Sequence, residues 1–294
     1  MIINEAPLTM NQTQATRLIF LHIPKTAGTT LKRVIERQYS VSEIGKCYYQ
    51  KRIKTLQEAI DRIHALPKEQ SDAIKIVVGH VGFGVHEHLP WPCSYITMLR
   101  DPIDRVISSY YQTRRGNLDP LREEAQRLSL KDFVSSGLVS AMNNGQTRLL
   151  SGASVEEDLT GKKIEYGGCD EGMLERAKKN LREQFKVVGL SERFDESLML
   201  MKRVLGWSSI YYVKANVGWN RTRKEEITRE TLRSIEKYNE LDIELYRYAV
   251  EMFDEAIGRQ GLLFKRRIDS YRLLNKTYGE ARRVLGAIEK IARR

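Results

Sequence analysis

The sequence predicts an α/β protein whose core is a parallel β-sheet flanked by helices. Short apolar runs of strand length recur along the chain, at residues 17–23, 73–78, 95–99 and 186–190, and helical patterns separate them. Strands separated by helices in this way form a parallel sheet with helices on both faces, and its ligands bind beyond the carboxyl ends of the strands. Lys25, His80 and Arg100 each follow one of the predicted strands. We therefore expect the functional site at that edge of the sheet.

The first predicted strand leads into a loop of small residues and then into a helix. Pro24 ends the strand, and the helical pattern begins at Leu31. In such a loop several backbone N–H groups converge at a helix N-terminus, where the helix dipole also favours an anion. The pattern predicts a phosphate-binding loop, although a turn without a ligand is the alternative. Its residues are Lys25, Thr26, Ala27, Gly28, Thr29 and Thr30.

This loop occupies the place of a Walker A loop, but its order is reversed. In Walker A the lysine follows the last glycine, and the next Ser or Thr holds Mg²⁺. Here Lys25 precedes Gly28, and no residue stands at the usual metal-holding position. A nucleotide kinase or NTPase is therefore only an alternative interpretation.

A second anion-binding pattern follows the strand at residues 95–99. Arg100 lies at the end of that strand, and Asp101 with Pro102 forms a helix start, with Asp as N-cap and Pro at the first helical position. Ser108 lies farther along this predicted helix. An arginine fork and a serine hydroxyl together suit one phosphate group. The alternative is that Arg100 pairs with Asp101 or Asp104 and that Ser108 faces solvent.

At these two stretches the chain resembles the sulfotransferases that use 3′-phosphoadenosine-5′-phosphosulfate (PAPS). Residues 21–31, LHIPKTAGTTL, are similar to the 5′-phosphosulfate loop of that family, and residues 99–111, LRDPIDRVISSYY, to its 3′-phosphate motif. The carbohydrate branch with the uronosyl 2-O-sulfotransferases is the most similar. Further stretches that resemble this branch are GHVGFG (79–84), NNGQTRLLSG (143–152), VVGLSERFDESLMLM (187–201) and LDIELYRYA (241–249).

The resemblance implies a sulfotransferase fold and a role for each motif. Lys25 would stabilise the bridging oxygen of the donor as its bond to sulfur breaks, and residues 26–30 would hold the 5′-phosphate. Arg100 and Ser108 would hold the 3′-phosphate. PAPS brings its own activated sulfate, so no metal is expected. Weaker candidates for cofactor contact, in a loop that closes over the nucleotide in relatives, are Asn216, Arg221 and Arg223.

His80 is the predicted general base. It follows a strand and stands between Gly79 and Val81, where a side chain can face a cleft. The acceptor hydroxyl needs a positioned base as its proton leaves. The uronosyl enzymes carry His-Gly-His here, and Val78 replaces their first histidine. A structural histidine at the strand end, with a carboxylate as the base, is the alternative.

A zinc site is an alternative interpretation of this region, because His80, His86 and His88 lie within nine residues. His86 and His88 are alternate residues and share a side only on a strand, whereas the prolines at 90 and 92 indicate a loop. We expect no metal.

Composition predicts a folded protein of a reducing compartment. The chain has 294 residues, a net charge of +11 and three cysteines that are far apart and odd in number, which indicates free thiols. The first 16 residues are polar and hold no apolar run of membrane-spanning length. We expect a cytoplasmic, bacterial-type soluble enzyme without a transmembrane segment, with peripheral membrane association as a further possibility.

Three regions are expected: a flexible arm at residues 1–16, a sulfotransferase domain at residues 17–260 and a basic amphipathic helix at residues 261–294. Ten Lys or Arg against three Asp or Glu at residues 265–294 place +7 of the +11 charge in the tail. This helix either packs on its own domain or on a second subunit, lies on an anionic membrane, or binds an acidic polymer.

The sequence therefore predicts sulfuryl transfer from PAPS to an acceptor hydroxyl. The expected acceptor is a glycan, which can be acidic. We expect no nucleic-acid partner. Peptide tyrosine and small molecules are alternative acceptors. A non-catalytic polyanion-binding protein is an alternative of another class.

Overall fold

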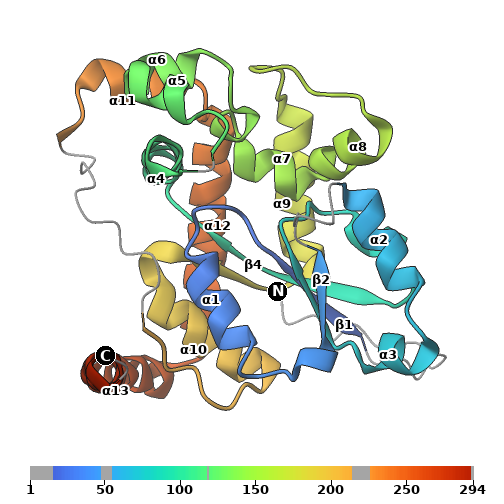
Figure 1. The fold of residues 1–294 in the computed structure, drawn as a ribbon, viewed down its shortest axis with the longest axis vertical. Coiled ribbons are helices and arrows are strands. Elements are labelled where there is room, and N and C mark those ends of the chain that lie inside the picture. Colours follow the sequence, from blue (N-terminus) through green and yellow to red (C-terminus); the bar gives the residue numbers. More distant parts are fainter. Residues whose placement is uncertain (1–15, 48–54, 118, 214–225, 293–294) are drawn as a thin grey trace.

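The computed structural model describes residues 16–47, 55–117, 119–213 and 226–292. Within these residues the core is a five-stranded parallel sheet in the order β2-β3-β1-β4-β5, covered by helices (Figure 1). The predicted α/β class is therefore confirmed. The strands are β1 (Arg17–Leu21), β2 (Ile44–Cys47), β3 (Ile76–Gly79), β4 (Cys93–Leu99) and β5 (Phe185–Leu190).

The apolar runs of the sequence form the central strands, because these strands are covered on both faces. All four residues of β3 are buried, and four of the five residues of β1 are buried. Strand β2 was missed by the sequence analysis. It contains Gly45 and Lys46 and forms an edge of the sheet, paired only with β3, so it carries no continuous apolar run.

Helices fill the connections between strands and build a small second core beside α4. There α4, α5, α6 and α11 come together (Figure 1), around side chains that include Ile107, Phe133 and Ile235. The helices are α1 (Gly28–Ile35), α2 (Leu56–His64), α3 (Lys68–Ala73), α4 (Pro102–Arg115), α5 (Arg122–Arg127), α6 (Leu130–Ser135), α7 (Gly145–Ser151), α8 (Ala153–Thr160), α9 (Glu171–Gln184), α10 (Phe194–Leu205), α11 (Arg229–Lys237), α12 (Glu240–Gly258) and α13 (Leu262–Ala292).

Local signals at helix starts were mostly correct. Asp101 caps α4 by accepting a 3.0 Å hydrogen bond from the Asp104 N–H, and Pro102 is the first helical residue, as predicted. Ser191 lies in the short turn before α10, whose N-cap is Arg193. The Ser191 hydroxyl donates to the Leu99 carbonyl at 3.0 Å and so joins the ends of β5 and β4.

The parallel sheet gathers the predicted site residues at one edge. Strand β1 lies between β3 and β4, and Leu21 pairs with Gly79 on one side and with Thr97 on the other. The residues that follow these strands therefore emerge side by side at the carboxyl edge. None of the helices in the described part of the chain combines the length and hydropathy that a bilayer crossing requires.

Candidate active site

The loop between β1 and α1 has the backbone geometry of an anion-binding nest. Lys25 and Ala27 both adopt the left-handed conformation, with φ values of 73° and 62°, which is strained for residues with a side chain. Alternating backbone of this kind turns successive N–H groups toward one point in front of the helix. Strain held at a loop of this composition supports a binding role for its amides.

The threonines of this loop differ in what their side chains do. Thr26 is fully buried, and its hydroxyl donates to the Ile23 carbonyl at 2.8 Å. It therefore stabilises the loop from within. Thr30 is buried in the first turn of α1, and Thr29 is exposed. The sequence placed all three hydroxyls around one phosphate, whereas the structure directs the Thr26 hydroxyl into the protein.

Position 28 requires glycine, because the His22 ring lies close to its backbone. A Cβ atom added to Gly28 would lie 1.9 Å from Cδ2 of the His22 ring, which no real side chain tolerates. The helix can begin this close to the end of β1 only because glycine has no side chain.

The two predicted phosphate motifs are joined through Lys25 and Arg100. Nη1 of Arg100 donates a 2.9 Å hydrogen bond to the Lys25 carbonyl, and the Lys25 side chain donates to Oε1 of Gln112 on α4. Arg100 also has an ion-pair partner, because its Nε lies 3.9 Å from a carboxylate oxygen of Glu192. The structure thus places the lysine of one motif against the arginine and the helix of the other.

Ser108 lies on the side of α4 that faces the loop. It is half-buried and precedes Gln112 by four residues, so the two side chains share one face of the helix. Because Gln112 accepts the hydrogen bond from Lys25, that face turns toward the phosphate-binding loop. Lys25 and Arg100 are therefore in contact, and Ser108 lies one turn before Gln112 on α4; the role of Ser108 at the 3′-phosphate stays a prediction.

His80 contacts a second histidine that the sequence analysis did not identify. Nδ1 of His80 lies 2.9 Å from the His22 carbonyl, and the centroids of the two rings are 4.4 Å apart. Because a carbonyl only accepts, the hydrogen bond places the His80 proton on Nδ1 and the lone pair on Nε2. The register of β1 and β3 explains the pairing, since the residues directly before the two histidines are partners in the sheet.

The environment keeps both imidazoles neutral. Burial lowers the pKa of His80 below its ordinary value of 6.5, the positive charge of Lys32 lowers it further, and the hydrogen bond to the His22 carbonyl acts in the opposite direction. Burial, followed by the charges of His80 and Lys32, lowers the pKa of His22 to about 3. A neutral His80 can accept a proton, which is the state that a general base requires.

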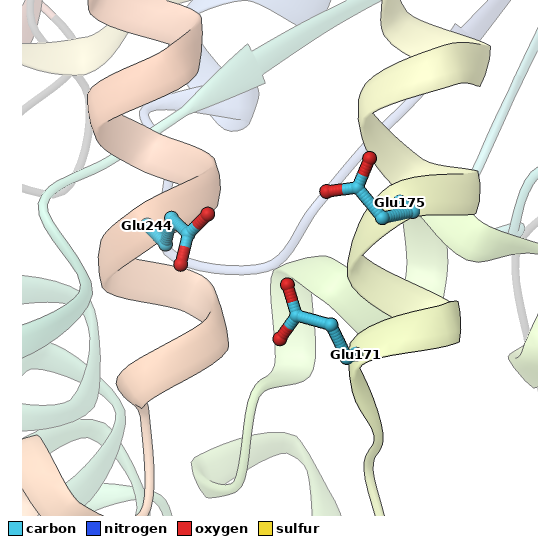
Figure 2. Close-up of side chains that lie close together, drawn as sticks. All are labelled: Glu171, Glu175 and Glu244. Carbon is cyan, nitrogen blue, oxygen red and sulfur yellow. The ribbon is translucent and has the colours of Figure 1, made fainter.

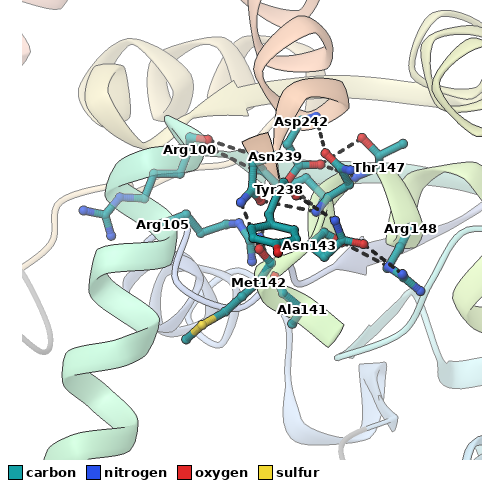
Figure 3. A network of polar contacts seen from close by, with 12 residues as sticks. Arg100, Arg105, Ala141, Met142, Asn143, Thr147, Arg148, Tyr238, Asn239 and Asp242 are labelled. Carbon is teal, nitrogen blue, oxygen red and sulfur yellow. Dashed lines mark hydrogen bonds and ion pairs between the residues drawn. The ribbon is translucent and has the colours of Figure 1, made fainter. Parts of the chain in front are cut away.

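Gln146 holds the backbone of Arg100 from α7. Its side-chain amide accepts from the Arg100 N–H at 3.0 Å and donates to the Arg100 carbonyl at 2.9 Å. Gln146 is fully buried, and Asp242 of α12 accepts hydrogen bonds from the N–H groups of Gln146 and Thr147 (Figure 3). Asp242 also forms a buried ion pair with Arg105, at 3.5 Å. This network fixes the start of α4, and hence the position of Arg100, against two other helices.

A model of the galactose-3-O-sulfotransferase family matches residues 2–277 of the sequence, which is most of the chain. The chain belongs to this family. The expectation of a carbohydrate sulfotransferase is confirmed at the level of the family.

Curated members of the sulfotransferases are similar over most of the chain. Human heparan-sulfate 6-O-sulfotransferase 1 is 27% identical over 275 residues, which are 81% of this chain and 66% of that protein. Heparan-sulfate 6-O-sulfotransferase 2 of Gallus gallus is 26% identical over 273 residues, which are 80% of this chain and 66% of that protein. The chain thus spans slightly less than two thirds of the length of these relatives.

Two solved structures are also similar. Mouse sulfotransferase SULT7A1 complexed with PAP aligns with a TM-score of 0.43 and 16% identity, over 79% of this chain and 84% of that one. A sulfotransferase from Alicyclobacillus acidocaldarius aligns with a TM-score of 0.34 and 16% identity, over 88% of this chain and 99% of that one.

Gln146 and Asp242 are the site-supporting residues that sequence reasoning missed. A signal for Gln146 was present, because the stretch at residues 143–152 resembles the carbohydrate branch. No role followed from that resemblance, since the contact with Arg100 crosses 46 positions of the chain. His22 was missed for a similar reason, because its partner His80 lies 58 positions away.

Two of the three histidines of the alternative zinc site, His80 and His86, make other contacts. Nδ1 of His86 lies 2.8 Å from the Tyr95 hydroxyl, and His88 is exposed. Among the described residues, three carboxylates do approach within 4.8 Å of one another, at Glu171, Glu175 and Glu244 (Figure 2). Nζ of Lys178 lies 2.8 Å from Glu175 and 2.5 Å from Glu244 and supplies positive charge there, and hydrogen bonds to these two carboxylates raise its pKa to about 12.

Three weaker candidates lie outside the described residues. Asn216, Arg221 and Arg223 all fall within residues 214–225. Their role in cofactor contact stays a prediction.

Proposed function

We propose that this protein transfers a sulfuryl group from PAPS to a carbohydrate hydroxyl. The observation that carries the proposal is the hydrogen bond between Arg100 and the Lys25 carbonyl, because it joins two anion-binding motifs into one site. Family membership supports the same reaction class. PAPS has a phosphosulfate at one end and a 3′-phosphate at the other, and it supplies the activated sulfuryl group when bound.

The residues present fit such a donor. The nest at residues 25–27 offers converging amides for the 5′-phosphate, and Lys25 supplies a positive charge beside them. Arg100 offers a planar fork and Ser108 a hydroxyl for the 3′-phosphate. The role of Lys25 is to stabilise the negative charge that collects on the bridging phosphate oxygen as its bond to sulfur breaks.

His80 takes the proton of the acceptor hydroxyl. As the acceptor oxygen forms its new bond to sulfur, the proton moves to Nε2, and the electron pair of the broken bond stays on the phosphate. The His22 carbonyl holds the other ring nitrogen in its protonated state and so orients the base. Because the sulfate is already activated, we propose that the reaction needs no metal.

Three sugar positions are candidates for the hydroxyl that is sulfated. The sequence resembles the uronosyl 2-O branch, the curated relatives are named as 6-O enzymes, and the family is named for the 3-O position of galactose. Cytoplasmic localisation and the bacterial type stay predictions.

The test is transfer of labelled sulfate from PAPS, in the presence of a chelator, to desulfated acidic polysaccharides, neutral glycans and tyrosine peptides. We expect a glycan product with the wild type, loss of that product with His80→Ala and retention with His88→Ala, a matched exposed histidine. Disaccharide analysis of the product identifies the hydroxyl. Transfer only to tyrosine peptides would overturn the acceptor class, and absence of PAPS binding would overturn the function.

A further inference from the structure

The last helix exposes an apolar surface that its own domain does not cover. Helix α13 lies at the edge of the molecule next to α10 (Figure 1) and packs on the domain through Phe264, Ile268 and Tyr271. These three residues follow one another at intervals of four and three, so they form one face of the helix. That buried face accounts for the attachment of α13 to the domain.

Large apolar residues of α13 lie outside the buried face, with Leu262, Leu273 and Val284 opposite it and Leu263, Leu274 and Leu285 on one flank. Most of the exposed large hydrophobic residues in the described part of the chain belong to this one helix, and their exposed fractions lie between 49% and 79%. Single exposed leucines are ordinary, whereas a row of them along one helix marks an interaction surface. The row consists of Leu262, Leu263, Leu273, Leu274, Val284 and Leu285, which we name the outer row.

The helix that carries the outer row is strongly basic. Between Leu262 and Ala292 it contains eight Lys or Arg against three Asp or Glu. Two of the arginines, Arg266 and Arg267, stand between the first and second pairs of the outer row in the sequence and are exposed. Apolar and basic side chains are thus mixed along the same helix.

The basic charge of α13 distinguishes among three possible binding partners for this surface. A second copy of the chain would bring two basic helices together within a Debye length of about 8 Å, where like charges repel. An acidic polysaccharide would attract the basic residues but would leave the leucines and the valine in water. An anionic lipid surface suits both the basic and the apolar side chains of α13, because headgroups pair with Lys and Arg while the acyl boundary takes up apolar side chains.

We propose that α13 docks the enzyme on an anionic membrane surface, with the outer row inserted at the boundary of the acyl chains. The helix lies in the plane of the interface and does not cross the bilayer. Binding therefore depends on both leucines and lipid charge, and it weakens as salt rises. Docking of this kind would hold the active site near acceptors at a membrane.

The experiment is co-sedimentation of the full chain with vesicles of phosphatidylcholine alone and with vesicles that contain phosphatidylglycerol in equal amount. We expect binding to the mixed vesicles and at least about tenfold weaker binding to phosphatidylcholine alone. The variant with Leu273, Leu274, Val284 and Leu285 all changed to Gln should lose about tenfold or more in binding to the mixed vesicles. Because these residues are exposed, the variant keeps its fold, which its thermal unfolding curve verifies.

A matched control changes exposed apolar residues elsewhere on the surface. Val41→Gln with Leu138→Gln removes two such side chains, 84% and 44% exposed, and should leave vesicle binding intact. Equal loss in this control would overturn the proposal, since binding would then be non-specific.

Three other results would also overturn it. Equal binding to both kinds of vesicle would show that lipid charge does not contribute to binding. A dimer in sedimentation velocity that the outer-row variant abolishes, without vesicle binding, would assign the surface to a second copy. The third result is that the protein binds heparin and does not bind vesicles. If the double variant Arg266→Gln with Arg267→Gln loses heparin binding and the outer-row variant keeps it, the surface of α13 binds an acidic polymer.

Discussion

Nη1 of Arg100 donates a 2.9 Å hydrogen bond to the backbone carbonyl of Lys25, across 75 positions of the chain. The Lys25 side chain in turn donates to Gln112, on the helix that Arg100 precedes. The two motifs that the sequence presents separately are therefore parts of one structure. A change in either one is expected to affect both ends of the donor site.

Replacing Lys25 with alanine is expected to lower kcat about 10²- to 10³-fold, which is the usual cost of removing one group that stabilises a developing anion. Affinity for the product 3′-phosphoadenosine-5′-phosphate (PAP) should fall by less, because the amides of the loop remain. Steady-state kinetics and calorimetry measure the two effects. Lys75→Ala, which removes an exposed lysine paired with Glu43, serves as the control and should change neither. Normal turnover in Lys25→Ala would contradict the role of this lysine.

Replacing Gln146 with leucine is expected to weaken binding of PAP about 10- to 100-fold while affecting AMP much less. The amide fixes the backbone of Arg100, and a displaced arginine loses charge-assisted hydrogen bonds to the 3′-phosphate, which AMP lacks. The dissociation constant of AMP divided by that of PAP, both measured by calorimetry, is the readout, and it should fall. Arg100→Ala should reduce the same ratio. The double variant Gln146→Leu with Arg100→Ala should reduce it little further than Arg100→Ala alone.

Thr147→Val is the matched control for the change at Gln146. It removes the hydroxyl that donates to Asp242 at 2.8 Å, so it weakens the same buried network without touching Arg100. Stability should fall, and the ratio of the AMP to the PAP dissociation constant should stay unchanged. A similar fall of the ratio in Thr147→Val would show that Gln146 acts only through stability.

The acid limb of kcat/KM is expected to lie below pH 6.5. The neutral form of His80 is the active one, and burial lowers its pKa, so the base stays unprotonated until the pH falls below the ordinary value. A pH profile of kcat/KM measures this limb. Because the charge of Lys32 also lowers the pKa of His80, Lys32→Gln should move the limb toward higher pH. A limb that stays in place in that variant would contradict the assignment of the limb to His80.

His22 is expected to make the folded state less stable in acid. Its folded pKa is about 3 and its ordinary value is 6.5, so between these limits the unfolded state binds more protons. The contribution is fully present above pH 6.5 and is lost as the pH falls toward 3, with a total of about 5 kcal/mol. Urea unfolding of the wild type and of His22→Phe measures it. The free energies of unfolding should converge as the pH falls from 6.5, and parallel curves would argue against this prediction.

Gly28→Ala is expected to destabilise the protein by about 2 to 3 kcal/mol, because the new Cβ would lie 1.9 Å from the His22 ring. In a double variant with His22→Ala the clash is absent, so the loss should be smaller than the sum of the two single losses. Gly258→Ala, at the end of α12 and without a neighbour within 4 Å, is the control and should be close to neutral. Additive losses in the double variant would show that the two residues do not interact.

Local patterns were sufficient for much of the fold. The central strands are continuous apolar runs because they are covered on both faces. Asp101 and Pro102 predict the start of α4. Edge strand β2 was not predictable in this way, since Gly45 and Lys46 interrupt any apolar run. Residues 122–127 form α5, a short polar helix with Ala125 buried against the second core, so no apolar run marks it in the sequence.

The sequence by itself determined the α/β class, the loop at Lys25 and the arginine at the end of β4, because each depends on neighbours within a few residues. Only the tertiary structure decided that His22 lies against His80, that Gln146 holds Arg100 and that the outer row of α13 is left uncovered. The order β3-β1-β4 brings together residues that are distant in the chain. That order results from packing among whole elements, which no local pattern encodes.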